Sequence, residues 1–261
     1  DVGPPSGGEQ HLVTDTNGKY NDIMTKEKWR LHMKWNEDIL DKLEPEISNI
    51  EEKKKLAERI AEKVEDGQVI GFGSGSTSYL ATIAIAEKIK QEDIKIKAIP
   101  TSFEINMLCG YLEIPTTNLL EAKPDWCFDG ADEVDGNNWL IKGRGGAMFK
   151  EKLNIVNSPI TYILIDKSKE VSKLGSKFKV PVECFPNSVN FVKQELGKLG
   201  GNDISLREAK GKDGPVITEN GNVILDVRFE NITKELEKQI KSITGVIESG
   251  LFINYNVEVI K

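Results

Sequence analysis

Short apolar runs that alternate with helical stretches restrict the folds open to this chain. Four such runs lie at 69–72, 94–99, 126–128 and 161–165, and the first two are followed by segments of helical composition. Strands separated by helices form parallel sheets, because a parallel pair needs a long crossover connection. The pattern therefore predicts an open α/β sheet that is mostly parallel and gathers its loops at one edge.

The run at 126–128 leads directly into a segment rich in carboxylates and glycine, residues 129–135. A second short apolar piece then delivers Lys142 to the loop 143–146, and a helical segment follows that carries Glu151. A lone Asp-Gly pair is more often only a surface turn. Here two acids, a cation and a flexible backbone occur together at strand ends, where open α/β sheets bind ligands.

The strand predicted at 69–72 runs into a loop of glycine, serine and threonine, residues 73–77, and a helix is expected over 78–90. In such a loop the glycines bring backbone N–H groups close to an anion, and the helix start adds partial positive charge. The loop has neither the lysine nor the spacing of a nucleotide-binding motif. A small phosphorylated ligand is the better interpretation, and a plain tight turn is the alternative.

The pattern of predicted strands and helices changes after about residue 178. Its elements follow the order β-α-β-β-α-β, which is the order of a ferredoxin-like module. We expect the last two strands, at 250–253 and 257–260, to return to the first sheet. The six predicted elements of the module lie at 179–185, 188–199, 203–208, 222–229, 233–243 and 245–248.

These patterns predict an α/β protein with a Rossmann-like, mostly parallel sheet domain and a smaller ferredoxin-like α+β domain. The predicted parts are a flexible tail at 1–24, an appendage helix at 25–47, a catalytic domain made of 48–177 plus 250–261, and the α+β domain at 178–249. The catalytic domain begins near Ser48, a predicted N-cap, with Glu51 three residues later.

Composition excludes several classes of protein. A net charge of -7 argues against non-specific binding of nucleic acid, which needs clustered lysine and arginine. Three widely spaced cysteines in apolar settings predict reduced core thiols and a cytoplasmic location. No apolar run approaches a membrane span, so no membrane partner is expected. The only histidines, His11 and His32, precede the main domain, which disfavours a Ser-His-Asp or Cys-His hydrolase.

Several motifs occur together and in order, and with them the chain resembles ribose-5-phosphate isomerases of the A type. The Gly/Ser/Thr loop resembles that family's phosphate loop, and Asp-Gly-Ala-Asp-Glu-Val its acidic motif. Arg144 stands where the family pattern has a glycine, which could narrow the pocket or add a cation. The matching segments are 71–77, 129–134, 142–147 with Glu151, 166–169, 180–183 and 218–226.

The resemblance implies the interconversion of D-ribose 5-phosphate and D-ribulose 5-phosphate in the non-oxidative branch of the pentose phosphate pathway. Glu151 is then the base that moves a proton between neighbouring carbons, and Lys142 with the loop N–H groups stabilises the enediolate. Asp129 moves protons between sugar oxygens, and Asp132 orients Lys142 or the substrate. No metal or other cofactor is expected, because lysine and amides can carry the electrophilic role.

A second set of residues is predicted to hold the hydroxyl groups and the 5-phosphate of the sugar. Some of them could instead be ordinary surface charges. Lys53 belongs to a run of three lysines that suits a solvated helix face, and Arg207 could be a surface ion-pair partner. Glu133 is expected to be a solvated loop charge. The predicted binding residues are Gly75, Ser76, Thr77, Gly143, Arg144, Gly145, Gly146, Lys169, Lys53 and Arg207.

Two other functions stay open at this point. A non-catalytic domain that senses sugar phosphates would share the sheet and its loops, and an isomerase of another sugar phosphate would share the acids and Lys142. The expected partner is a small sugar phosphate. We also expect the chain to form a homodimer or homotetramer.

Overall fold

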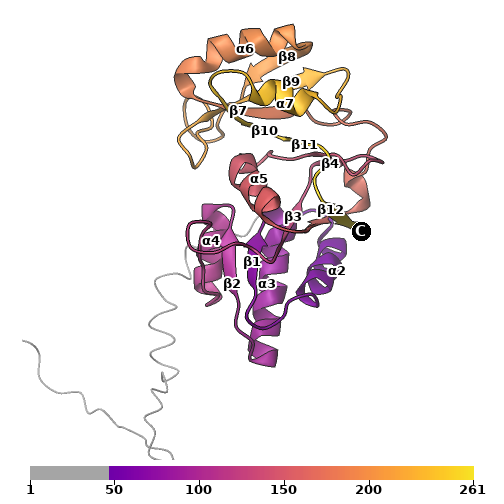
Figure 1. The fold of residues 1–261 in the computed structure, drawn as a ribbon, viewed down its shortest axis with the longest axis vertical. Coiled ribbons are helices and arrows are strands. Elements are labelled where there is room, and N and C mark those ends of the chain that lie inside the picture. The colour runs from indigo at the N-terminus through magenta and orange to yellow at the C-terminus, as the bar shows by residue number, and fades with distance from the viewer. Residues whose placement is uncertain (1–46) are drawn as a thin grey trace, which may run out of the picture. The chain divides into compact units, whose positions relative to one another are not determined.

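Three β-sheets build the part of the chain that the structure, a computed structural model, describes, residues 47–261 (Figure 1). The predicted tail at 1–24 and the appendage helix at 25–47 lie outside the described residues, apart from Ile47. Within the described part, no helix is long and apolar enough to cross a membrane.

The first sheet has five parallel strands in the order β12-β6-β3-β1-β2. Each strand is a short apolar run, as the sequence predicts. The strand order reverses between the neighbouring strands β1 and β3, which is the switch point where such sheets bind ligands. This arrangement confirms the predicted Rossmann-like, mostly parallel sheet. The strands are β1 (Val69–Phe72), β2 (Lys97–Pro100), β3 (Trp126–Gly130), β6 (Thr161–Leu164) and β12 (Val257–Ile260).

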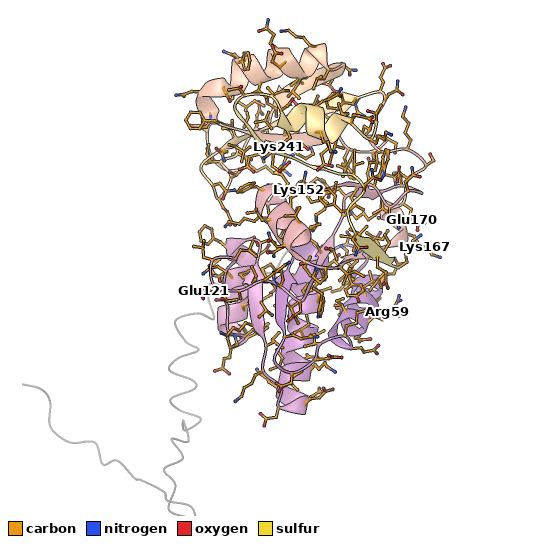
Figure 2. All side chains as sticks on the ribbon, in the orientation of Figure 1. Arg59, Glu121, Lys152, Lys167, Glu170 and Lys241 are labelled. Carbon is orange, nitrogen blue, oxygen red and sulfur yellow. The ribbon has the colours of Figure 1, made fainter. Side chains whose placement is uncertain are left out.

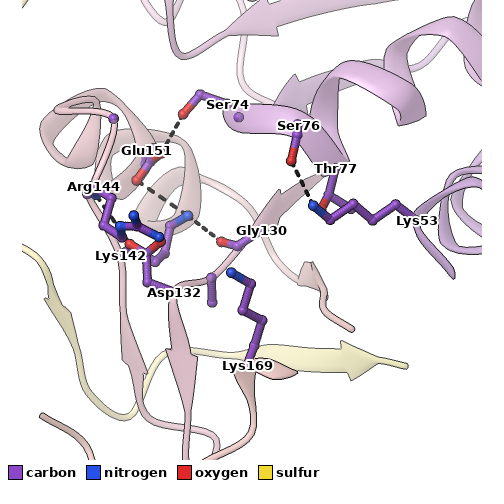
Figure 3. Close-up of a pocket in the computed structure, with 14 residues that line it drawn as sticks. Lys53, Ser74, Ser76, Thr77, Gly130, Asp132, Lys142, Arg144, Glu151 and Lys169 are labelled. Carbon is purple, nitrogen blue, oxygen red and sulfur yellow. Dashed lines mark hydrogen bonds and ion pairs between the residues drawn. The ribbon is translucent and has the colours of Figure 1, made fainter. Parts of the chain in front are cut away.

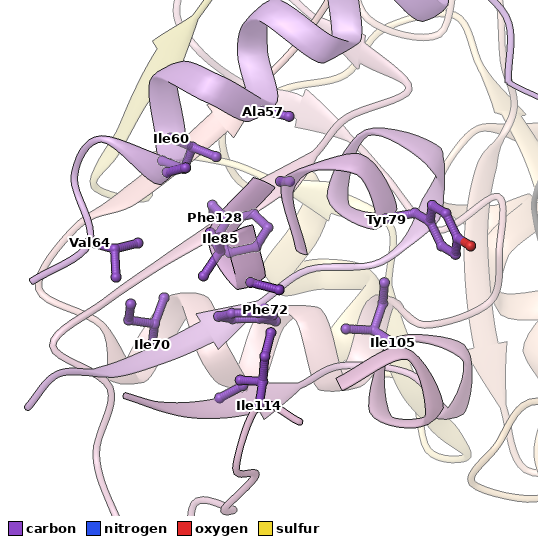
Figure 4. Packing of buried hydrophobic residues seen from close by; sticks show 14 of the residues in the cluster. Ala57, Ile60, Val64, Ile70, Phe72, Tyr79, Ile85, Ile105, Ile114 and Phe128 are labelled. Carbon is purple, nitrogen blue, oxygen red and sulfur yellow. The ribbon is translucent and has the colours of Figure 1, made fainter. Parts of the chain in front are cut away.

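Helices cover both faces of this sheet. Side chains alternate along β3, so Phe128 (Figure 4) and Trp126 join the core formed with α2 (Ile50–Ala61) and α3 (Gly75–Glu92). Cys127 packs on the opposite face, in the core that holds α5 (Met148–Asn157). Asp129 lies two residues after Cys127 on the same strand, so its carboxylate is on the same face of the sheet, the one covered by α5.

The remaining helix of the first half, α4 (Phe103–Tyr111), begins directly after the edge strand β2. The Ser102 hydroxyl accepts a hydrogen bond from the Ile105 N–H and caps this helix. A 3-10 turn, η1 (Lys167–Lys169), follows β6.

The second sheet is antiparallel, in the order β10-β7-β9-β8. Its two helices pack apolar side chains on it, and the order of strands along the chain confirms the ferredoxin-like module. The elements are β7 (Val180–Cys184), the turn η2 (Pro186–Ser188), α6 (Val189–Lys198), β8 (Gly201–Leu206), β9 (Val223–Phe229), α7 (Leu236–Lys241) and β10 (Val246–Ser249). The division into domains at 178 and 249 stays a prediction, since the described residues 47–261 all belong to one compact unit.

A small third sheet was not predicted. It consists of β11 (Leu251–Phe252), β5 (Leu140–Ile141) and β4 (Glu133–Val134), all antiparallel. The expectation that 250–253 returns to the first sheet is therefore wrong, and only 257–260 does so. The two-residue strands are too short to show an alternating pattern.

Some predicted boundaries are also wrong. The first helix is capped by Asn49 in a left-handed conformation, not by Ser48. The helix expected over 78–90 already begins at Gly75. Gly75 has a φ of 81°, which glycine adopts at little cost, so the helix starts earlier than the hydroxyl-rich sequence suggests. The three cysteines are free and buried, as predicted.

Lys152 connects α5 to the ferredoxin-like module (Figure 2). Its buried ammonium lies 2.6 Å from Glu237 Oε1 and 3.0 Å from Glu248 Oε1. It also donates to the carbonyl oxygens of Ser249 and Leu251. Four acceptors on α7, β10 and β11 thus fix the helix that carries Glu151.

Candidate active site

A cavity of about 130 Å³ opens where the loops after β1, β3, β5 and β6 meet (Figure 3). The position follows from the parallel sheet, since the carboxyl ends of neighbouring strands lie at one edge. Figure 3 shows Lys53, Ser76 and Thr77 on one side of the cavity and Lys142 and Glu151 on the other. The lining residues are Lys53, Ser74, Gly75, Ser76, Thr77, Gly130, Ala131, Asp132, Lys142, Gly143, Arg144, Gly145, Glu151 and Lys169.

Lys142 is the centre of the acidic side. Its buried Nζ lies 2.9 Å from Asp129 Oδ2 and 3.3 Å from Glu151 Oε2, and it donates to the carbonyl oxygen of Gly130. The bond to the Gly130 carbonyl and the two ion pairs together fix the direction of the ammonium. The Lys142 backbone N–H is bound to Gly250 O at 2.9 Å, which ties β5 to the segment before β11.

Ser74 holds the carboxylate of Glu151 from the opposite side. Its hydroxyl donates to Glu151 Oε1 at 2.6 Å, and its backbone N–H donates to Asp129 Oδ1 at 3.2 Å. Within the described residues Glu151 Oε2 accepts no hydrogen bond, and Lys142 at ion-pair distance is its neighbour. One oxygen of Glu151 is therefore anchored by a hydrogen bond, while the other is buried without a hydrogen-bond partner.

The contact between Ser74 and Asp129 depends on Gly73. A Cβ atom on Gly73 would lie 2.3 Å from the Asp129 carboxyl carbon and 2.6 Å from Asp129 Cα. Only a residue without a side chain lets the loop after β1 approach β3 this closely.

Burial and charge perturb the titration of this cluster. Burial, with the nearby Glu151 carboxylate, raises the pKa of Asp129 to about 7, against the opposing effect of Lys142. Burial also raises the pKa of Asp132. Although burial lowers the pKa of Lys142, the carboxylates of Asp129 and Glu151 raise it above its ordinary value. Lys142 is thus a fixed cation, and Asp129 can gain or lose a proton near neutral pH.

The other side of the cavity is cationic. Lys53 is buried, not on a solvated helix face, and its Nζ donates to Ser76 Oγ at 3.0 Å. Burial lowers the pKa of Lys53. Lys169, from η1, points into the same region (Figure 3). Two lysines, two hydroxyl side chains and the N-terminus of α3 form a site suited to a phosphate group.

Comparisons with known proteins agree with this geometry. The sequence model of the family "Ribose 5-phosphate isomerase A (phosphoriboisomerase A)" matches residues 97–261. A relative from Methanocaldococcus jannaschii, ribose-5-phosphate isomerase A, is 44% identical over 79% of this chain and 92% of its own.

The chain belongs to the ribose 5-phosphate isomerase A family.

Solved structures of this family have the same fold. The enzyme from Methanocaldococcus jannaschii superposes with a TM-score of 0.79 at 43% identity, over 81% of this chain and 95% of that one. A D-ribose-5-phosphate isomerase in complex with phospho-erythronic acid gives 0.78 at 37% identity, over 82% and 95%. The Plasmodium falciparum protein gives 0.74 at 32% identity, over 80% and 93%.

Most of the predicted site residues of this isomerase A family member line the cavity. Asp129 pairs with Lys142 but does not itself line the cavity, and Gly146 does not line it either. Arg207 is elsewhere: it binds Asp226 and the carbonyl oxygens of the 143–146 loop. The roles assigned to these residues stay predictions.

Sequence reasoning missed two participants and misjudged a third. Ser74 and the Gly130 carbonyl touch Glu151 and Lys142, and their place in the two glycine motifs was the available signal. Glu133 is not a solvated loop charge. It is fully buried, and its carboxylate accepts hydrogen bonds from the backbone N–H groups of Gly175, Lys177 and Phe178, each at 2.7 Å.

Proposed function

We propose that this protein interconverts D-ribose 5-phosphate and D-ribulose 5-phosphate through an enediolate. Membership of the ribose 5-phosphate isomerase A family supports the reaction. The observation that carries it is the Glu151 carboxylate, which has one oxygen without a hydrogen-bond partner, 3.3 Å from the buried Lys142 ammonium, in a cavity whose other side is cationic. A related structure is in complex with phospho-erythronic acid, which supports a small phosphorylated ligand here.

The cationic side is the proposed seat of the 5-phosphate. Lys53 and Lys169 supply charge, and Ser76, Thr77 and the Gly75 N–H at the start of α3 supply donors. Anchoring this group places the reacting carbons toward Lys142 and Glu151. Binding energy from the phosphate then orients the sugar for proton transfer.

Glu151 is the proposed base. In the open-chain aldose, Oε2 takes the proton from carbon 2, and the electron pair forms a double bond between carbons 1 and 2. The carbonyl oxygen on carbon 1 becomes the negative oxygen of the enediolate. Return of the proton to carbon 1 gives the ketose, with the proton of the carbon 2 hydroxyl moved to the oxygen on carbon 1. Ser74 keeps Glu151 aligned through its 2.6 Å hydrogen bond.

Lys142 and the 143–146 loop are proposed to stabilise the negative charge of the enediolate. The ammonium of Lys142 is held at its acceptors before substrate arrives, which is the preorganisation that electrostatic stabilisation needs. Asp129, with a pKa of about 7, is suited to carry protons between sugar oxygens and to open the ring. The Asp132 carboxylate accepts a hydrogen bond from the Arg144 N–H at 3.2 Å. Its direct contact is therefore with the 143–146 loop, and we propose that it orients this loop and not Lys142.

Turnover of purified protein tests this function. Ribose 5-phosphate should be converted to ribulose 5-phosphate with EDTA present, and other sugar phosphates should react more slowly. Binding of ribose 5-phosphate without turnover would favour the sensor function instead. Fast turnover of a different sugar phosphate alone would assign another substrate, with Arg144 as the first residue to examine.

Two further proposals concern the state of the protein. We propose a cytoplasmic location, which the three buried free cysteines support. We also propose a homodimer or homotetramer, which is supported by exposed apolar side chains on α4 and α5: Phe103 is 60% and Val156 is 56% exposed.

A further inference from the structure

The loop 143–146 between β5 and α5 is held from two sides. On one side, the carboxylate of Asp132 accepts a hydrogen bond from the Arg144 N–H at 3.2 Å. On the other, Arg207 Nη1 donates to Gly143 O at 2.9 Å and to Arg144 O at 2.8 Å. The peptide unit between Gly143 and Arg144 is thus fixed at its carbonyl and at its N–H.

Arg207 approaches the loop from outside the cavity. Together with Phe178 and Lys179 it lines a separate hollow of about 380 Å³, and Arg144 alone is shared with the lining of the cavity. Asp226 on β9 accepts from Arg207 Nε at 2.8 Å and also contacts Nη2. The two side chains are 16% and 20% exposed, so this is a mostly buried, bidentate pair.

Its partners explain why Arg207 is not suited to bind phosphate. Asp226 neutralises the guanidinium, and two loop carbonyls occupy Nη1. The cationic residues Lys53 and Lys169 line the cavity and not this hollow, whereas Arg207 lines the hollow and not the cavity.

The hydrogen bond from Arg207 to Arg144 O also determines the direction of the Gly145 N–H. In a trans peptide the C=O and N–H point in opposite directions, and the described chain has no cis peptide bond. When Arg144 O is drawn to Arg207, the Gly145 N–H must point away from Arg207, toward the cavity that Gly145 lines. Among the described residues no acceptor for this N–H is found, so it is available to a ligand oxygen.

We propose that Arg207, braced by Asp226, is a positioning residue that aims the Gly145 N–H at the enediolate oxygen. The inference rests on the proposed isomerase function and adds a residue that never touches the substrate. It replaces the expectation that Arg207 binds the phosphate. Losing one oxyanion donor typically lowers kcat by about 10²–10³-fold, and a misaimed donor retains part of its effect.

The test compares Arg207→Met with Lys179→Met. Lys179 is a matched control, because it lines the same hollow and pairs with Asp203 at 2.9 Å but bonds no loop carbonyl. Arg207→Met should lower kcat by about 10–100-fold with KM for ribose 5-phosphate within about threefold, whereas Lys179→Met should change neither. Added methylguanidine should restore part of the kcat of Arg207→Ala.

A second readout does not depend on turnover. Amide hydrogen exchange in a peptide covering 143–147 should speed up in Arg207→Met and in Asp226→Asn, and should be unchanged in Lys179→Met. If Arg207→Met does not fold, Asp226→Asn and Arg207→Lys carry both measurements. Inactive wild type with the expected exchange pattern would refute the proposed function but leave the loop geometry standing.

Two results would overturn the inference. One is a tenfold or larger rise in KM and in the inhibition constant of inorganic phosphate at unchanged kcat, which would make Arg207 a phosphate ligand. The other is wild-type exchange and wild-type kcat in both Arg207→Met and Asp226→Asn.

Discussion

Replacing Lys152 by methionine should destabilise the protein strongly. Methionine keeps most of the side-chain length and removes the ammonium that lies among Glu237, Glu248 and two carbonyl oxygens. Removing one partner of a buried ion pair costs about 3–5 kcal/mol, because the remaining charge is left uncompensated.

The contacts that survive determine where in this range the loss falls. Glu248 keeps Lys241 at 3.2 Å, and Glu237 keeps the Tyr255 hydroxyl at 2.7 Å and the Ile253 N–H at 2.9 Å. Because each carboxylate retains a partner, we expect a loss of about 3 kcal/mol, at the lower end of the range for buried pairs.

Lys150→Met is the matched control. Lys150 lies on the same helix and pairs with Glu219 at 2.8 Å, but both side chains are about a third exposed. Solvent weakens such a pair, so the control should lose about 1 kcal/mol or less. Urea unfolding followed by circular dichroism measures both free energies. An equal loss in the two variants, or a loss below about 1 kcal/mol in Lys152→Met, would refute the reasoning.

Three further predictions concern pH, packing and assembly. The pKa of Asp129 is raised from 3.8 to about 7, so the folded state holds this proton more tightly; its contribution to stability is present at low pH and is lost as pH rises toward 7. The free energy of unfolding of Asp129→Asn should therefore fall less than that of the wild type between about pH 5 and about pH 8, and equal slopes would contradict the raised pKa. Gly73→Ala should lower the melting temperature, because overpacking against Asp129 should cost about 1–3 kcal/mol. Gly110→Ala is the control and should not lower it, because the added methyl group meets nothing within 4 Å. Equal melting temperatures of the two variants would contradict the close approach of Gly73 to Asp129. Light scattering at micromolar concentration should give the mass of at least two chains, and a monomeric mass would contradict the proposed oligomer.

The sequence predicted the main strands because each is a short apolar run with a loop at its end. The ferredoxin-like module followed from the order of its elements, and the residues of the cavity followed from the glycine loops and acids at strand ends. Apolar runs, the order of elements and short motifs carried these predictions, and all three are read directly along the chain.

What the sequence could not reveal depends on contacts between distant segments. Glu133 looks like a loop acid, and it is buried because the N–H groups of 175–178 converge on it. Lys53 looks like one of three surface lysines, and its burial depends on the loop that carries Ser76. Arg207 carries no local sign of its bond to the 143–146 loop. Charged side chains with tertiary partners were the hardest to predict.

The most direct test of the central claim is isomerisation in D₂O by the wild type and by Glu151→Gln. If Glu151 carries the proton through an enediolate, wild-type ribulose 5-phosphate should contain solvent deuterium on carbon 1, because the base can exchange its proton with solvent. Glu151→Gln should lose about 10²-fold or more in kcat and in deuterium incorporation, while KM stays similar. Near wild-type turnover by Glu151→Gln, or product free of deuterium at every stage of the reaction, would contradict the account.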